Sequence, residues 1–176
     1  MARIVLVHGA SSSGKTTLAR ALQDQLPAPF WHVSLDTLRD GGALPLARFA
    51  SGEFDWRAHR VAVFEGFHRS LAAYAEAGND LIVAHILDTA GWQARLAELL
   101  SGHDLFFVAL RCPPECLAER EAARGDRPPG SAVRDEATIH EGRRYDLTLD
   151  GRAPAAFAHH GRADLRPEGA RSDDHA

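Results

Sequence analysis

The feature that most constrains this chain is the octapeptide Gly9-Ala-Ser-Ser-Ser-Gly-Lys-Thr16, which follows the pattern G-x-x-x-x-G-K-[ST]. In such a loop the glycines let successive backbone N–H groups curl around phosphate oxygens, while the lysine and the hydroxyl reach the β/γ-phosphates and Mg²⁺. Lys15 is the only lysine in the chain, and nineteen arginines carry the other side-chain positive charges. A compact ammonium fits between phosphate oxygens better than a planar guanidinium does. The octapeptide therefore predicts a phosphate site.

The residues on either side of the octapeptide strengthen this interpretation. Residues 3–7 form a short, β-branched apolar run typical of a buried strand, and residues 17–22 continue as an amphipathic helix. The alternative is a glycine-serine loop with an incidental lysine, which needs neither the strand before it nor the helix after it. The helix favours a phosphate site, because a helix N-terminus adds positive potential there. The residues expected to bind the nucleotide are Gly9, Ala10, Ser11, Ser12, Ser13, Gly14, Lys15, Thr16 and Thr17, with Thr16 as the Mg²⁺ ligand.

The rest of the chain alternates between apolar runs and helical patterns. Candidate strands lie at residues 3–7, 31–35, 81–84, 104–110 and 146–149. Candidate helices lie at residues 57–77, 91–100 and 113–123, the first with Val61, Phe64, Phe67, Leu71 and Tyr74 on one face. This alternation predicts an α/β fold with a five-stranded parallel sheet between helical layers. We expect one domain over residues 1–160 and a polar, disordered tail over residues 161–176.

Composition narrows the classes of partner. The chain has 176 residues, a formal net charge of -4 and 45% hydrophobic residues, without a basic stripe. A chain with this charge has little electrostatic attraction to the phosphates of a nucleic acid, so a small-molecule substrate is the simpler expectation. No apolar run is long enough to cross a bilayer, and the N-terminus enters a strand directly, so we expect no membrane partner and a cytoplasmic location. The sequence leaves the oligomeric state open.

Asp36 is the candidate for the chemical step. It directly follows the apolar run 31–35, and ligands of open α/β sheets bind beyond the carboxyl ends of the strands. A carboxylate there could accept the proton of an attacking hydroxyl and orient its oxygen toward the γ-phosphorus. Asp36 could instead cap the helix that begins at Thr37, and local sequence alone does not decide between the two roles.

A second cluster contains Arg120, Arg124 and Arg127, and it runs from a helical pattern through a glycine into a proline loop. It could form a lid that neutralises transition-state charge and excludes water. The alternative is a solvated Arg/Glu helix face, which is the commoner fate of such runs. The phosphate loop favours the lid.

A third cluster, at residues 140–150, ends in an alternating strand pattern. Tyr145 and Asp146 could fix this last strand. His140 could line an acceptor pocket, although a lone histidine is more often structural.

Together these segments resemble the chloramphenicol phosphotransferase family of P-loop kinases over nearly all of residues 1–150. The resemblance rests on the loop with its serines, on Leu35-Asp-Thr-Leu38, on the Arg-Glu-x-x-Arg-Gly-Asp-Arg run from Arg120, and on the motif from His140 to Asp150. It implies a P-loop kinase fold, ATP as phosphoryl donor with Mg²⁺, and an antibiotic hydroxyl as acceptor. It also implies that Asp36 accepts the proton, that Lys15 and Arg127 take part in catalysis, and that Arg124 and Arg127 close over the nucleotide.

Two features depart from this family. Its third strand ends in acids that hold Mg²⁺ through water, whereas Ala84 and His85 stand here. Asp88 could replace that acid only if its loop returned to the site, and neutral His85 could at most hydrogen-bond a metal-bound water or the acceptor. The segment between Asp36 and Arg57, which would wall the acceptor site, is short for the family.

The leading hypothesis is an ATP- and Mg²⁺-dependent kinase that phosphorylates a hydroxyl of a small, partly apolar molecule such as an antibiotic. Trp31, Phe49, Phe54 and Trp56 could line its pocket or belong to the core. One alternative is a metabolite or nucleotide kinase of the shikimate or gluconate type. Another is a nucleotide-binding module with little turnover, because the metal-holding acid is missing.

Overall fold

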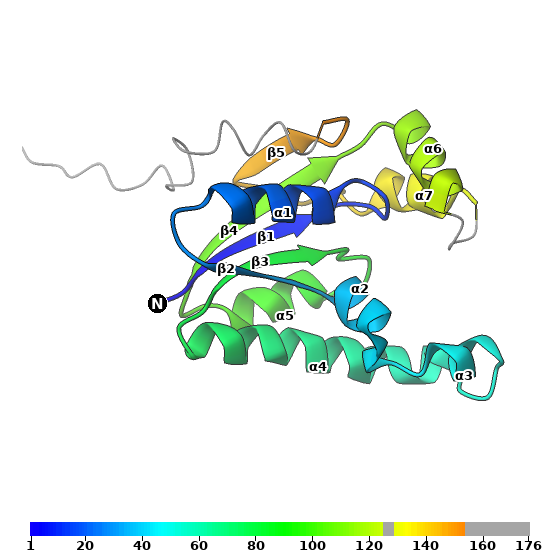
Figure 1. Cartoon of the computed structure of the whole chain (residues 1–176), viewed down its shortest axis with the longest axis horizontal. Coiled ribbons are helices and arrows are strands. Elements are labelled where there is room, and N and C mark those ends of the chain that lie inside the picture. Colours follow the sequence, from blue (N-terminus) through cyan, green and yellow to red (C-terminus); the bar gives the residue numbers. More distant parts are fainter. Residues whose placement is uncertain (125–128, 154–176) are drawn as a thin grey trace, which may run out of the picture.

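A five-stranded parallel sheet in the strand order β2-β3-β1-β4-β5 forms the centre of the computed structural model, which describes residues 1–124 and 129–153 (Figure 1). The strands are β1 Arg3–His8, β2 Phe30–Ser34, β3 Asp80–His85, β4 Asp104–Arg111 and β5 Leu147–Asp150. All five strand expectations and the parallel α/β fold are confirmed.

The helices are α1 Lys15–Gln25, α2 Leu35–Leu38, α3 Leu46–Ala50, α4 Trp56–Glu76, α5 Trp92–Leu99, α6 Pro114–Arg124 and α7 Ser131–Thr138, and a π-helical turn, η1, spans Arg39–Ala43. Figure 1 shows α4 and α5 on one face of the sheet and α1 on the other. The three-layer arrangement expected from the alternation is therefore present.

Side chains that alternate between the two faces of each strand explain why the sheet has a helical layer on each side. In β1, Ile4 and Leu6 pack with the core of α4 and α5, whereas Val5 and Val7 pack with the core of α1. A central parallel strand is buried on both faces, which is why this run is continuously apolar. Because all strands point the same way, their carboxyl ends meet at one edge, beside the loop before α1, α2 and α6 (Figure 1).

The last strand is fixed by the residues just before it, as expected. The Phe107 N–H donates to Oδ2 of Asp146 at 2.7 Å, and the Asp146 N–H donates to the Phe107 carbonyl at 2.9 Å. The Tyr145 ring lies 4.7 Å from the Phe107 ring, centroid to centroid. Asp146 therefore fixes the register of β5 against β4.

Two details differ from the expectations. Val61 is 72% exposed, although its spacing placed it on the buried face of α4. The first turns of α4 project beyond the sheet (Figure 1), and the contacts to Trp92 of α5 come from the neighbouring side chains Arg60 and Phe64. Helix α7 was not anticipated, because the carboxylate that caps it comes from elsewhere: Glu121 of α6 accepts hydrogen bonds from the Ala132 N–H at 2.9 Å, the Gly130 N–H and the Ser131 hydroxyl.

The expected tail at residues 161–176 and the lid residue Arg127 lie outside the described residues. In the part of the chain that is described, none of the helices combines the length and apolar character needed to cross a membrane.

Candidate active site

The loop between β1 and α1 has a strongly curved backbone. Gly14 has φ of 102°, and Ser12 is the one non-glycine residue with positive φ (61°) within residues 1–124 and 129–153. Gly9 must lack a side chain, because a Cβ there would lie 2.5 Å from the Leu110 carbonyl oxygen. Curvature of this kind directs successive N–H groups to one side, which is the geometry of an anion site.

The side chains of this loop are suited to binding phosphate. The Oγ atoms of Ser11, Ser12 and Ser13 are buried and have no hydrogen-bond partner among residues 1–124 and 129–153. Leaving a buried hydroxyl unsatisfied costs about 1–3 kcal/mol, and phosphate oxygens would accept such bonds. Lys15 Nζ donates to the Gly9 and Ala10 carbonyls at 2.9 and 2.6 Å, so its ammonium lies over the loop. These residues fit a nucleotide phosphate.

A cavity of about 500 Å³ opens over this loop. Its lining combines the loop with α1, the ends of two strands, and α6: Ser11, Ser12, Gly14, Lys15, Thr16, Thr17, Ser34, Asp36, Ala84, Arg120, Ala123 and Arg124. Thr16 is exposed there, so its hydroxyl could hold a metal ion together with phosphate oxygens. The described residues contain no cluster of three or more His, Cys, Asp or Glu side chains that could hold a metal. Of the expected nucleotide ligands, Gly9, Ala10 and Ser13 lie in the loop but not in this lining.

A second cavity, of about 390 Å³, is also lined by Lys15. Its walls come mainly from α2, η1, α3, α4 and the end of β3. Most of the lining residues are apolar: Leu35, Leu44, Leu46, Phe49, Trp56, Phe64, Ala84 and Ile86. The polar part of its lining is Ser11, Lys15, Asp36, Arg39, Arg60, His85 and Asp88. This cavity is suited to a small molecule with an apolar part and hydrogen-bonding groups.

The two cavities share Ser11, Lys15, Asp36 and Ala84. Asp36 is half-exposed in the first turn of α2, and Arg39 Nη1 lies 3.0 Å from its Oδ1. The capping alternative for Asp36 is wrong, because the cap is Ser34, whose Oγ accepts the Thr37 N–H at 3.0 Å. The Asp36 carboxylate therefore lines both cavities while it is paired with Arg39.

The end of β3 does not provide the missing acid. Asp88 lines the second cavity, where Arg60 Nη2 holds its two oxygens at 2.7 and 2.9 Å, and it does not line the cavity over the phosphate loop. His85 is 3% exposed, and its Nε2 lies 2.8 Å from Nε2 of His68. Burial lowers the pKa of His85 to about 3, so its ring is neutral near pH 7.

The aromatic residues divide between the two suggested roles. Phe49 and Trp56 line the second cavity, and Phe54 packs against Phe49 at 5.7 Å between ring centroids. Trp31 is 50% exposed and packs against Tyr74, so it does not wall this cavity. Sequence reasoning missed Arg60 and Phe64 as cavity residues, although successive steps of four residues, from Trp56 to Arg60 and from Arg60 to Phe64, place all three on one helix face.

The arginine and histidine clusters have separate roles. Arg120 and Arg124 line the cavity over the phosphate loop. His140 lines neither of the two cavities: its Nδ1 lies 2.7 Å from the Tyr145 hydroxyl, and its Nε2 lies 3.4 Å from Oε2 of Glu136. The acceptor-pocket role considered for His140 is therefore wrong, and the ring is structural.

Buried neutral histidines predict that the protein loses stability in acid. Nε2 of His8 lies 3.1 Å from the Ile139 carbonyl, its Nδ1 accepts the Leu87 N–H at 3.2 Å, and burial lowers its pKa to about 3. His8 and His85 thus have folded-state pKa values below the unfolded value of about 6.5. Their stabilising contribution is fully present above about pH 6.5 and is lost as the pH falls toward 3, at about 1.4 kcal/mol per pH unit for each ring.

Urea unfolding between pH 7.5 and 5 measures this effect. We expect His85→Gln, which keeps a polar partner for His68, to reduce the pH dependence, and His59→Gln, at an exposed site, to leave it unchanged. Equal pH dependence in the wild type and His85→Gln would contradict the assignment to His85.

Comparisons with known proteins identify the family of this chain. The family model described as "Chloramphenicol phosphotransferase-like protein" matches residues 2–160. A curated relative from Mycobacterium tuberculosis, "Putative O-phosphotransferase Rv2636", is 28% identical over 169 residues, which cover 84% of this chain and 74% of the relative.

Solved structures share the fold. The Mycobacterium tuberculosis APS kinase CysC, in complex with AMPPNP and APS, has a TM-score of 0.64 at 20% identity and covers 90% of this chain and 94% of its own. The tunicamycin resistance protein of Deinococcus radiodurans has a TM-score of 0.61 at 19% identity and covers 91% and 93%. Shikimate kinase from Acinetobacter baumannii has a TM-score of 0.60 at 19% identity and covers 91% and 90%. The chain belongs to the chloramphenicol phosphotransferase-like family, and it is a phosphotransferase with the P-loop kinase fold.

Proposed function

We propose that this protein transfers the γ-phosphoryl group of ATP to a hydroxyl of a small, uncharged and partly apolar molecule. The observation that carries the proposal is that a cavity over the phosphate loop and a mainly apolar cavity meet at Lys15 and Asp36. A donor in the first and an acceptor in the second would bring the γ-phosphate and the hydroxyl together at this wall.

Asp36, Lys15 and the residues around the donor cavity have distinct chemical tasks in this proposal. Asp36 takes the proton from the hydroxyl of the acceptor molecule while the hydroxyl oxygen forms a bond to the γ-phosphorus. The bond between this phosphorus and the β,γ-bridging oxygen breaks, which releases ADP. Lys15 and the loop N–H groups bind the β- and γ-phosphates and stabilise the negative charge that develops on the leaving oxygen. Thr16 would hold Mg²⁺, which, when bound, neutralises phosphate charge. Arg124, in the lining of the donor cavity, and Arg127 would close over the nucleotide and exclude water.

Charge pairing inside the acceptor cavity supports an uncharged acceptor. Arg39 pairs with Asp36, and Arg60 pairs with Asp88, so each guanidinium in the lining already has a carboxylate partner there. An anionic acceptor would have to compete with these carboxylates for an arginine. This pairing favours a neutral molecule, such as an uncharged antibiotic, over an acid such as shikimate or gluconate.

An acceptor screen tests the proposal. The purified protein would be given ATP and Mg²⁺ with neutral hydroxylated molecules, including chloramphenicol, and with shikimate and gluconate as anionic acceptors. We expect ADP release to increase, and a phosphate ester to appear by mass spectrometry, with a neutral acceptor. Preference for an anion would indicate a metabolite kinase. Tight ATP binding with no phosphate ester from any acceptor would indicate a binding module instead.

A further inference from the structure

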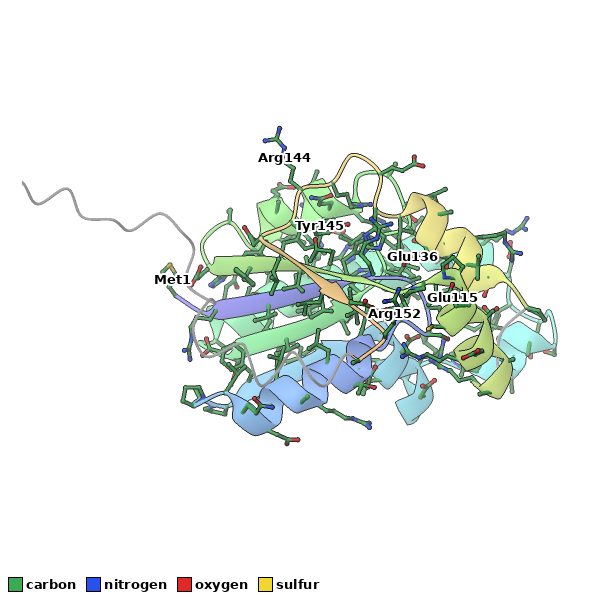
Figure 2. The ribbon with its side chains drawn as sticks, turned by 90° about the horizontal axis from the view of Figure 1, so that it is seen from above. Met1, Glu115, Glu136, Arg144, Tyr145 and Arg152 are labelled. Carbon is green, nitrogen blue, oxygen red and sulfur yellow. The ribbon has the colours of Figure 1, made fainter. Side chains whose placement is uncertain are left out.

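Arg120 of α6 is held by backbone carbonyl groups rather than by acidic side chains in the described structure. Its Nη1 donates to the Gly151 carbonyl at 2.8 Å and to the Ser13 carbonyl at 3.3 Å, and its Nη2 donates to the Arg152 carbonyl at 3.1 Å. Nη1 also lies 3.5 Å from Sγ of Cys112. One guanidinium therefore joins the phosphate loop, α6 and the end of β5, where Figure 2 labels Arg152.

The bond to Ser13 orients a peptide group of the phosphate loop. A trans peptide is planar, and its C=O and N–H point in opposite directions. Because Arg120 holds the Ser13 carbonyl, the N–H of Gly14 in the same peptide group points away from Arg120. Gly14 lines the donor cavity, and loop N–H groups are the donors that cradle phosphates.

Few other hydrogen bonds hold Ser13 in the described structure. The Ser13 N–H, which belongs to the preceding peptide group, donates to the Ala10 carbonyl at 3.3 Å, and the Ser13 hydroxyl has no partner among the described residues. Ser12 holds a left-handed conformation that is unfavourable for a residue with a Cβ. Gly151 packs directly on the loop, since a Cβ there would lie 2.8 Å from the Ser13 carbonyl oxygen. Arg120 and the chain at Gly151 thus support the loop from outside.

We infer that Arg120 is a positioning residue of the phosphate site, acting on the nucleotide through the Ser13–Gly14 peptide. Both terminal nitrogens of its guanidinium donate to carbonyl oxygens of the protein, which distinguishes it from a lid arginine that contacts phosphate directly. The inference rests on the proposed binding of a nucleotide at this loop.

The test compares Arg120→Met and Arg120→Lys with a matched control, Arg95→Met. Arg95 also makes several bonds, to Glu65 and Glu98, but it joins α4 to α5 and lines neither of the two cavities. Loss of either arginine should lower the melting temperature. Two further measurements separate positioning from stability: hydrogen–deuterium exchange of the loop amides in the ligand-free protein, and the Kd for ADP by calorimetry at a temperature where every variant is folded.

We expect Arg120→Met to speed exchange in the loop and to raise the Kd for ADP about tenfold or more, because small displacements of binding groups cost that much. Arg120→Lys should recover only part of the loss, since an ammonium lacks the planar fork that reaches several carbonyls together. Arg95→Met should change neither quantity.

The outcomes that overturn the inference differ from those that overturn the proposed function. If Arg120→Met weakens ADP binding while loop exchange is unchanged, or if Arg120→Lys restores ADP affinity fully, then Arg120 acts directly through its charge. If Arg120→Met matches the wild type in both measurements, it has no role at the site. If the wild type binds no ADP, the proposed function fails, and the inference fails with it.

Discussion

Replacing Lys15 by alanine is expected to lower kcat for phosphoryl transfer about 100- to 1,000-fold, which corresponds to about 2.7–4 kcal/mol of transition-state stabilisation. Lys15 lies on the wall shared by the two cavities, and its ammonium is held over the phosphate loop by the Gly9 and Ala10 carbonyls. The charge that develops on the transferred group and on the leaving oxygen would lose its nearest compact cation. Steady-state kinetics with the best acceptor from the screen measures the effect.

Two variants make this result specific. Arg20→Ala removes a positive charge from an exposed position on the same helix and should leave kcat near the wild-type value. Lys15→Arg keeps the charge but replaces the ammonium by a broad planar group, so it should recover little activity. Full activity in Lys15→Arg would show that only the charge is needed and would contradict the geometric argument.

Replacing Asp36 by asparagine is expected to lower kcat about 10²- to 10⁴-fold with little change in nucleotide affinity. Asparagine keeps the shape of the side chain but cannot take the acceptor's proton. Nucleotide affinity should persist because the phosphate-binding groups of the loop, Lys15 and the N–H groups, stay in place. The measurement is single-turnover phosphoryl transfer beside calorimetric ADP binding.

Asp40→Asn is the matched control for this prediction. Arg39 pairs with both carboxylates, at 3.0 Å from Asp36 and 2.8 Å from Asp40, but Asp40 lines neither of the two cavities. Loss of the Arg39 pairing at position 40 should therefore leave turnover unchanged. If Asp36→Asn retains full turnover, Asp36 is not the proton acceptor.

Local sequence signals were enough for the strands and for the phosphate loop. Short β-branched runs bounded by turn residues identify buried strands, and the loop is a contiguous pattern whose glycines and lysine have fixed tasks. The place of Asp36 at the carboxyl end of β2 followed from the same local reasoning. Its cavity position did not, because α2, α3 and α4 only enclose that space after the chain has folded.

The misplaced residues were those whose environment depends on distant segments. Val61 fits the apolar period of α4, but its side chain is 72% exposed, and the first turns of the helix extend past the sheet (Figure 1). His140 was considered for an acceptor pocket, yet its ring lies 5.0 Å from the ring of His8 in β1, centroid to centroid, and its Nδ1 lies 2.7 Å from the Tyr145 hydroxyl. Periodicity shows which face of an element is apolar, and it carries no information on where the element ends relative to its neighbours.

The sequence by itself determined the parallel α/β fold, the loop built to bind phosphates and the carboxylate after the second strand, because each depends on neighbouring residues. Only the tertiary structure decided that two cavities meet at Lys15 and Asp36, that His85 pairs with His68, and that Arg120 holds the Ser13 carbonyl. These contacts join residues 17 to 107 positions apart. Their partners are selected by the packing of whole layers, which no local pattern encodes.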